Sequence, residues 1–441
     1  MKYYSTNDTS ARAGLEQAVV KGLAPDKGLY MPLEVKRLPE EFFENIDKLS
    51  FQEIACVVAD AFFGGDIPAD ELRKIVYDTL AFDCPLEKVG ENIWSLELFH
   101  GPTLAFKDVG ARFMARLLGY FISKSGDSRE VNVLVATSGD TGSAVANGFL
   151  GVEGIHVYVL YPKGKVSPIQ ECQFTTLGRN VTAIEVDGVF DDCQALVKSA
   201  FVDAELNAAM KLTSANSINV ARFLPQAFYY FHAYAQLKRM GLADNVVVCV
   251  PSGNFGNICA GLFGKRMGLP VRRFIAANNE NDVFFEYLSS GEYKPRASVQ
   301  TIANAMDVGA PSNFARIAEL YGHDVDAVRA DVSGARFSDE QIRETVASVY
   351  RETGYLCDPH GACGMRALQQ QLKPGETGVF LETAHPAKFK DTVEPLIGGP
   401  VAIPERLAAF MKGTKESVPM AADFAAFKSF LLSRQAMRKN L

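Results

Sequence analysis

The sequence lacks the patterns that usually mark metal sites and disulfide frameworks. Its eight cysteines form no CxxC pair, and several lie in apolar runs such as VVVCV and EIACVVAD. Cysteines of this kind are typical of small buried hydrophobic residues rather than disulfides or metal ligands. The six histidines are equally scattered, with no HExxH spacing. We therefore expect no protein-bound catalytic metal.

Basic clusters and long apolar runs are also missing. The formal net charge is −7, and no block of lysine and arginine is longer than a pair, which argues against a surface for nucleic acid or anionic membrane. No apolar run approaches the ~18 residues of a membrane span. The first residues, MKYYSTNDTSARAG, contain no apolar signal core. We therefore expect a cytoplasmic protein with neither nucleic-acid nor membrane partners.

The pattern of apolar residues changes along the chain. With 441 residues, 48% of them hydrophobic, the protein is large enough for two or three domains. Between residues 10 and 90, stretches such as FQEIACVVADAFF have apolar residues at helical spacing. After residue 130, short apolar runs alternate with glycine turns and helices; these runs are VNVLVAT, IHVYVLYP, VTAIEV, NVVVCVP, VRRFIAA and GVFLETA. They predict two parallel-sheet α/β lobes, at residues 130–190 and 245–385, with a cleft between them.

Two glycine-rich turns follow buried strands in this pattern. The turn in VVVCVPSGNFGNICAG comprises Ser252, Gly253, Asn254, Phe255, Gly256 and Asn257. The turn in VLVATSGDTGSAVANGF comprises Thr137, Ser138, Gly139, Asp140, Thr141 and Gly142. A strand, a glycine turn and a helix N-terminus together form an anion cradle, because backbone N–H groups and the helix dipole attract negative charge. The first spacing matches neither GxGxxG nor a P-loop, so a phosphate without a nucleotide fits it better. Either turn alone is also compatible with an ordinary glycine turn, whereas both together indicate two anionic groups in one cleft.

One cation stands in an apolar loop, HGPTLAFKDVG, at residues 100–110. Lys107 is either a surface lysine whose stem covers apolar neighbours or a desolvated, reactive amine. The apolar stripe that follows places Lys107 at a helix start, with Asp108 near the N-cap. A helix N-terminus and an apolar loop both disfavour the ammonium form. A reactive lysine beside a bare phosphate cradle indicates pyridoxal phosphate.

Two further segments offer polar groups to the same cleft. GVFLETAHPAKFKD brings Thr383 to the carboxyl end of a predicted strand, where it either meets the cofactor's pyridine nitrogen or caps a turn. TSANSINVARFLPQ places Asn216, Ser217 and Arg222 at a helix start, as a phosphate site or as a capping loop with a solvated arginine. Lys388, in HPAKFKD, lies among polar residues, which indicates a solvated charge.

Taken together, these motifs resemble the threonine synthase family, within the fold-type II pyridoxal-phosphate enzymes. The resemblance spans almost the whole chain and runs through HGPTLAFKD, ATSGDTG, LYPKGKVSPIQ, NSINVAR, VPSGNFGN, NAMDVGAPSN and TAHPAKFK. It implies two parallel-sheet lobes with a helical N-terminal domain. The expected divisions are an N-terminal domain at 1–92, a catalytic region at 93–400 (smaller lobe about 108–215, larger lobe about 93–107 plus 216–400) and a helical tail at 401–441.

The resemblance also implies roles for individual residues. Lys107 would be the Schiff-base lysine, residues 252–257 would hold the cofactor phosphate, and Thr383 would meet the pyridine nitrogen. The substrate's α-carboxylate would bind Thr137, Ser138, Asp140 and Thr141, and its phosphate would bind Asn216, Ser217 and Arg222. Many relatives have asparagine in place of Asp140. An acid at that position must be protonated or turned away if it faces the cofactor's phenolic oxygen.

The implied reaction is the last step of threonine biosynthesis, the conversion of O-phospho-L-homoserine and water to L-threonine and phosphate, in a monomer or homodimer. Lys107 would take the α-proton and later a β-proton, while Arg222 and Asn216 would stabilise the departing phosphate. A threonine or serine dehydratase of the same fold would share Lys107 and the glycine turn but would need no second phosphate site. A non-enzymatic protein that binds pyridoxal phosphate or another metabolite is the other alternative. A nicotinamide dehydrogenase would need a GxGxxG turn, which neither loop has.

Overall fold

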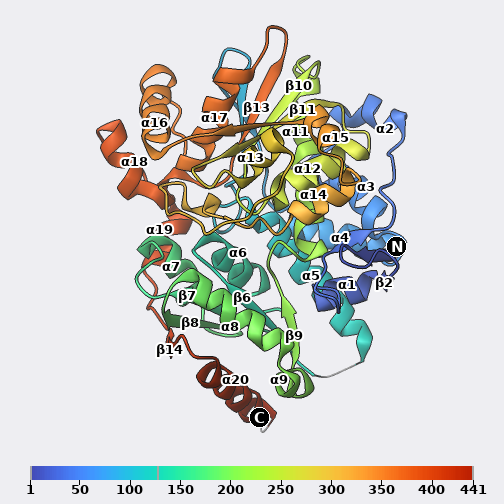
Figure 1. Cartoon of the computed structure of the whole chain (residues 1–441), viewed down its shortest axis with the longest axis vertical. Coiled ribbons are helices and arrows are strands. Elements are labelled where there is room, and N and C mark those ends of the chain that lie inside the picture. Colours follow the sequence, from blue (N-terminus) through green and yellow to red (C-terminus); the bar gives the residue numbers. More distant parts are fainter. Residues whose placement is uncertain (1, 127–128, 440–441) are drawn as a thin grey trace.

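The computed structural model describes residues 2–126 and 129–439, which form two parallel-sheet lobes (Figure 1). The larger lobe contains a six-stranded sheet in the order β12-β11-β10-β13-β5-β4. All neighbours in this sheet are parallel except β4 and β5. Its strands are β4 (Leu86–Gly90), β5 (Ile93–Glu97), β10 (Val246–Pro251), β11 (Val271–Asn278), β12 (Val332–Arg336) and β13 (Thr377–Glu382).

The smaller lobe contains a five-stranded sheet in the order β14-β8-β7-β6-β9, in which all neighbours are parallel. Its strands are β6 (Val131–Ala136), β7 (Ile155–Pro162), β8 (Val181–Asp187), β9 (Lys211–Ser214) and β14 (Val418–Ala421). Every residue of β6, β7, β10 and β13 is buried, as expected for sheets covered by helices on both faces. All six predicted apolar runs form strands, and the predicted α/β architecture is confirmed.

The N-terminal unit is largely helical and packs directly on the larger lobe. The stretch FQEIACVVADAFF forms α3 (Phe51–Phe63) as predicted. This helix begins with a capping box between Ser50 and Glu53 and is followed by α4 (Ala69–Thr79). The unit also contains α1 (Leu15–Lys21), α2 (Glu40–Asn45), the 3-10 helix η1 (Ile46–Lys48) and a small antiparallel sheet of β1 (Lys2–Ser5), β2 (Ala13–Gly14) and β3 (Tyr30–Pro32). One cluster of buried apolar side chains runs from this unit into both lobes. The N-terminal unit therefore shares a core with the catalytic region.

Helices connect and cover the strands of both lobes, and those that begin at strand ends carry the candidate site. They are α5 (Lys107–Ser125), α6 (Asp140–Phe149), α7 (Pro168–Thr175), α8 (Phe190–Val202), α9 (Ala204–Ala209), α10 (Val220–Phe223), η2 (Leu224–Gln226), α11 (Ala227–Arg239), α12 (Gly256–Arg266), α13 (Val283–Ser290), η3 (Asn304–Met306), α14 (Phe314–Leu320), α15 (Val325–Asp331), α16 (Asp339–Thr353), α17 (Pro359–Gln371), η4 (Pro386–Phe389) and α18 (Lys390–Ile397). None of the helices in the described ranges is long and apolar enough to cross a membrane.

The C-terminal segment returns to the smaller lobe, where α20 (Phe424–Lys439) lies at the lower end of the molecule in Figure 1. After α19 (Glu405–Met411), residues 418–421 form β14 at the edge of the smaller sheet, and Phe427 and Leu431 of α20 are buried in that lobe's core. The segment expected as a helical tail thus also contributes a strand. At the other boundary, β4 joins the larger sheet although it lies within the expected N-terminal domain.

Candidate active site

Lys107 is the first residue of α5 and lies where β13 of the larger sheet ends. The loop before it is hydrogen-bonded to that strand end: Phe106 N donates to Thr383 O (2.9 Å), and His385 N donates to Leu104 O (3.1 Å). Leu104 has φ +58°, a conformation that costs free energy in a non-glycine residue and is concentrated at functional sites. The predicted proximity of Lys107 and Thr383 thus follows from backbone pairing.

Asp108 does not cap α5, so that prediction is wrong. Its carboxylate accepts hydrogen bonds from Thr103 N (2.9 Å) and Thr103 Oγ1 (2.6 Å), and the N-cap residue, Phe106, has helical backbone angles with no side-chain cap. The side chain turns back because the buried loop offers two donors that would otherwise be unpaired. Asp108 therefore fixes the shape of the loop that carries Lys107, and it forms no salt bridge with any described residue.

The surroundings of Lys107 disfavour its ammonium form. Burial lowers the pKa of Lys107 to about 8, and the positive charges of Arg222 and Lys388 add to this effect while Asp140 opposes it. Within the described part of the chain its Nζ forms no ion pair. The neutral amine is the form that reacts with a carbonyl group, so this environment suits a reactive lysine.

The turn between β10 and α12 approaches neighbouring segments closely. A Cβ atom on Gly253 would lie 2.8 Å from Ala305 O, and one on Gly256 would lie 3.2 Å from Ser217 Cβ. Phe255, at the N-cap of α12, has φ +62°. The first N–H groups of a helix have no intrahelical acceptor, so this turn presents donors and the positive end of the helix dipole to an anion.

The side chains of this turn serve mostly to hold it in place. Ser252 donates from N and from Oγ to backbone carbonyls of β11 and β10, both at 2.8 Å. Asn257 Oδ1 accepts from the hydroxyls of Tyr229 and Tyr230, and its buried Nδ2 has no partner among the described residues. Asn254 Nδ2 donates to Ser217 Oγ (2.9 Å). The last contact joins the glycine turn to the second predicted phosphate segment.

Arg222, in that second segment, is 2% exposed. It donates from Nη1 to Ala215 O, but its buried Nε has no partner in the described chain, and neither has Asn216 Oδ1. Burial lowers the pKa of Arg222 to about 10, so the guanidinium stays charged at neutral pH. A buried cation with an unused donor is suited to an anionic ligand. The alternative of a solvated arginine is therefore excluded.

The turn between β6 and α6 contains both structural and available groups. The Thr137 hydroxyl donates to Gly139 O and accepts from the N–H groups of Gly139 and Gly142, so it holds the turn together. Ser138 and Thr141 are partly exposed, and their hydroxyls form no hydrogen bond with any described residue. The start of α6 therefore presents two hydroxyls and its first N–H groups to a ligand.

Asp140 is ionised, and its carboxylate is held by two donors. Its Oδ1 lies 2.6 Å from Lys388 Nζ and accepts from Gln170 Nε2 at 2.9 Å. Burial alone would raise the pKa of Asp140, but the charges of Lys388 and Lys107, with these hydrogen bonds, lower it to about 2. The prediction of a solvated Lys388 is wrong, because this side chain is completely buried. Gln170 ends the LYPKGKVSPIQ motif and Lys388 lies in HPAKFKD, but neither motif by itself indicates a contact with Asp140.

The donor set fits pyridoxal phosphate. Lys107 offers an amine of lowered pKa, the Gly253–Asn257 turn offers a cradle, and the Thr383 hydroxyl forms no hydrogen bond with the described residues. Arg222 Nε and Asn257 Nδ2 are buried donors without partners among the described residues. Buried donors normally form hydrogen bonds, so these two atoms are available to a bound ligand.

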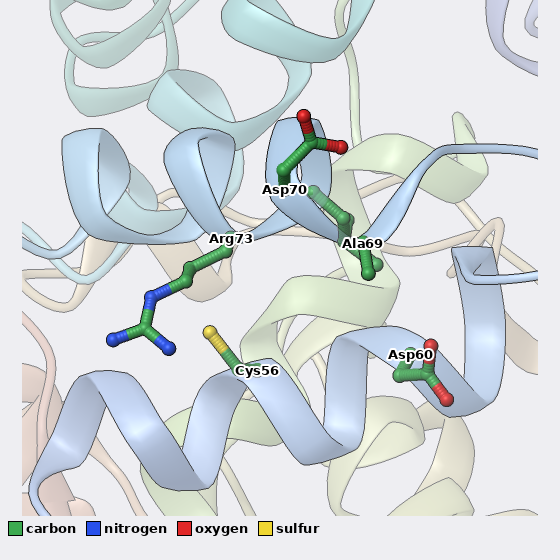
Figure 2. Close-up of a pocket in the computed structure, with 6 residues that line it drawn as sticks. Cys56, Asp60, Ala69, Asp70 and Arg73 are labelled. Atoms are coloured by element: carbon green, nitrogen blue, oxygen red, sulfur yellow. The ribbon is translucent and has the colours of Figure 1, made fainter.

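A hollow of about 310 Å³ lies elsewhere, between α3 and α4, and Figure 2 shows Cys56 and Arg73 facing each other across it. None of its lining residues belongs to the site around Lys107. Burial raises the pKa of the Cys56 thiol, which makes it a weak nucleophile. We assign this hollow no role in the chemistry.

Comparisons with known proteins agree with this geometry. The family described as pyridoxal-phosphate dependent enzyme matches residues 75–383; threonine synthase N terminus matches 2–80, and threonine synthase C-terminal matches 361–431. Threonine synthase of Haemophilus influenzae is 46% identical over 98% of this chain and 100% of its own length. Threonine synthase of Escherichia coli is 45% identical over 99% of this chain and 100% of its own length.

Solved structures show the same similarity. The crystal structure of threonine synthase from Escherichia coli superposes with a TM-score of 0.92 at 43% identity and covers 98% of this chain and 100% of its own. A pyridoxal-phosphate-bound threonine synthase from Brucella melitensis superposes with a TM-score of 0.91 at 36% identity and covers 99% of each chain. Maize serine racemase, at 14% identity and a TM-score of 0.53, shares the fold alone.

Proposed function

Because the chain belongs to the threonine synthase family, we propose that Lys107 carries its pyridoxal phosphate and that the polar groups around Lys107 bind its substrate. The activity is that of the family, the conversion of O-phospho-L-homoserine and water to L-threonine and phosphate, the last step of threonine biosynthesis. The residue assignment rests on Arg222. Its Nε is a buried donor with no partner among the described residues, and the charge of its guanidinium acts directly on Lys107.

Pyridoxal phosphate, when bound, withdraws electrons from the substrate and so acidifies the protons on its α-carbon and then on its β-carbon. In our proposal the backbone N–H groups of Gly253–Asn257 and the dipole of α12 hold its phosphate, with Ser252 and Asn254 holding the turn. The Thr383 hydroxyl meets its pyridine nitrogen. The close approach of Gly253 and Gly256 to neighbouring segments supports this assignment, because it brings the turn's backbone within reach of an anion.

The substrate in this proposal spans the two turns. Its α-carboxylate binds at the start of α6, to the hydroxyls of Ser138 and Thr141 and the helix N–H groups, while Thr137 and Asp140 shape the turn. Its phosphate binds Arg222 with Asn216 and Ser217. The unpartnered Nε of Arg222 supports the phosphate assignment, because a charge-assisted hydrogen bond to phosphate would satisfy it.

Lys107 moves the protons in this scheme. Its Nζ takes one proton from the substrate's α-carbon and one from the β-carbon. It returns one to the γ-carbon after phosphate has left and one to the α-carbon after the hydroxyl of water has added at the β-carbon, and the other proton of that water goes to the released phosphate. A pKa of about 8 lets the same amine both accept and release protons near neutral pH. Arg222 stabilises the charge of the departing phosphate, and water then adds at the β-carbon.

We also propose the domain limits 1–92, 93–400 and 401–441, with β4 and β14 as strands that the terminal domains add to the two sheets. The N-terminal family region, residues 2–80, lies within the first of these limits, whereas the C-terminal family region, residues 361–431, overlaps both the second and the third. We propose that the protein is located in the cytoplasm and is a monomer or homodimer. Light scattering of the purified protein tests the assembly.

The test of the function compares wild type with Arg222→Ala and with Arg343→Ala, a matched change at an exposed arginine. Wild type should release equal amounts of phosphate and L-threonine from O-phospho-L-homoserine. Arg222→Ala should keep the cofactor's visible absorbance and lose about 100-fold in kcat/KM, the order seen for lost transition-state donors, while Arg343→Ala should match wild type. A protein that binds the cofactor but only deaminates L-threonine or L-serine would be a dehydratase and would contradict the proposal.

A further inference from the structure

Lys388 and Asp140 form an ion pair in the interior of the site, and the proposed reaction gives this pair no role. The Lys388 and Asp140 side chains are 0% and 5% exposed, and their Nζ and Oδ1 atoms are 2.6 Å apart. Asp140 is the first residue of α6, whereas Lys388 lies in η4, just beyond the end of β13. The pair therefore joins the smaller lobe to the strand end that carries Thr383.

Further hydrogen bonds orient both members of the pair. Gln170 Nε2 donates to the same Asp140 oxygen at 2.9 Å. Lys388 Nζ also donates to Thr103 O at 2.8 Å, and Thr103 is the residue whose N–H and hydroxyl bind Asp108. Lys388 thus holds the anion turn with one hydrogen bond and the loop that leads to Lys107 with another.

A buried ion pair is a weak source of stability, because desolvation of both charges offsets their attraction. Its position beside Lys107 suggests a different use. The charges that act on Lys107 are the carboxylate of Asp140 from α6, the guanidinium of Arg222 from α10 and the ammonium of Lys388 from η4. Asp108, the next residue in α5, is bound to Thr103. Asp140 and Lys388 therefore act on Lys107 with opposite signs.

We propose that Lys388 is a positioning residue for the reaction: it holds the Asp140 carboxylate at the start of α6 and balances its charge beside Lys107. The pair then acts as one neutral, hydrogen-bonding unit, which accounts for the acid at position 140, because a neutral amide there would leave the buried Lys388 ammonium without a counter-charge. This inference rests on the proposed role of Lys107.

The two single substitutions should have opposite effects on Lys107. Lys388→Met leaves an uncompensated carboxylate, which favours the protonated form of the lysine nitrogen. Asp140→Asn leaves an uncompensated ammonium, which favours the unprotonated form. The double variant Asp140→Asn/Lys388→Met removes both charges together, so its effect should be smaller than that of either single variant.

The experiment is a pH titration of the holoenzyme's visible absorbance, alongside the pH dependence of kcat. We expect the midpoints to move up by about one pH unit in Lys388→Met and down by about one in Asp140→Asn, the scale of a close charge pair. The double variant should bring the midpoints close to wild type and recover part of kcat, because the contacts of Lys388 with Asp140 and Thr103 stay lost. Lys390→Met, at a partly exposed lysine two residues further on, is the matched control and should not move the midpoints. Thermal unfolding of each variant separates loss of fold from loss of positioning.

Shifts of the same sign in both single variants, or no shift, would overturn the proposal. If Lys388→Met fails to fold or to bind cofactor, the double variant decides: recovered folding and cofactor binding support the pair as a unit, and a double variant that fails in the same way contradicts it. The wild type tests the proposed function separately. A wild type without visible absorbance or phosphate release overturns that function, whereas an active wild type with unshifted variants overturns only the role of Lys388.

Discussion

Gly253→Ala tests the phosphate cradle at a position where its turn packs tightly against the backbone of residues 305–306. The added Cβ would lie 2.8 Å from both Ala305 O and Met306 Cα. These are backbone atoms, and Ala305 N is held by His360 Nε2 at 3.2 Å, so the facing segment cannot move without losing a hydrogen bond. The turn itself must therefore shift away from the position in which its N–H groups meet a phosphate.

The size of the effect follows from this contact. Overpacking of this kind typically costs about 1–3 kcal/mol, which corresponds to roughly 5- to 150-fold in a dissociation constant. We expect the cofactor-free variant to bind pyridoxal phosphate more weakly by that factor when titrated by visible absorbance. Gly256→Ala, whose nearest neighbour would be the side-chain atom Ser217 Cβ at 3.2 Å, should have a smaller effect, and Gly399→Ala, with no atom within 4 Å, should have none.

Equal cofactor affinities of Gly253→Ala and Gly399→Ala would refute this account of the cradle. They would mean either that the 305–306 backbone gives way freely or that the turn does not bind the phosphate. Thermal unfolding distinguishes the two, because a backbone that gives way freely leaves the midpoint of Gly253→Ala unchanged, whereas a strained turn that binds no phosphate lowers it.

Three further results follow from the same geometry. First, kcat should rise with pH through about 8 and then level off, because the pKa of Lys107 is about 8 and its unprotonated amine is the base; an acid limb near 6 would contradict this. Second, Asp108→Ala removes two hydrogen bonds to a buried carboxylate and should destabilise the protein by about 3 kcal/mol in thermal unfolding, with Asp108→Asn affected less. Third, the Arg316 guanidinium donates to Tyr30 O of the N-terminal unit and to Ser217 O, and so connects this unit to the phosphate segment. Lysine has no planar guanidinium that can make both contacts, so Arg316→Lys should raise the KM for O-phospho-L-homoserine by about tenfold. An unchanged KM would show that Arg316 does not position the phosphate segment.

Much of the fold could be predicted from the sequence because it depends on local patterns. Apolar runs bounded by glycine turns identify buried strands wherever they pair, and all six formed strands in the two sheets. The sites around residues 137–142 and 252–257 could be found because a turn between a strand and a helix is a contiguous feature. The position of Lys107 at a helix start was predicted from the spacing of the apolar residues after it.

Long-range contacts decided the features that local patterns could not predict. Lys388 stands among polar residues in the sequence, and its burial depends on Asp140, which is distant along the chain. Asp108 has the position of a helix cap, but two donors on Thr103 compete successfully for its carboxylate. Residues 418–421 are half exposed and contain a proline, so they show no strand pattern and pair only because β8 offers an open edge.

The central claim is that Lys107 is the residue that carries the cofactor. Reduction of the holoenzyme with sodium borohydride makes the lysine–cofactor linkage permanent, and mass spectrometry of the resulting peptides then locates it. The account predicts the added pyridoxyl phosphate mass on the peptide that contains Lys107 and its absence from the Lys107→Ala variant. The same mass on Lys388 or on any other lysine, or no modified peptide from active enzyme, would contradict it.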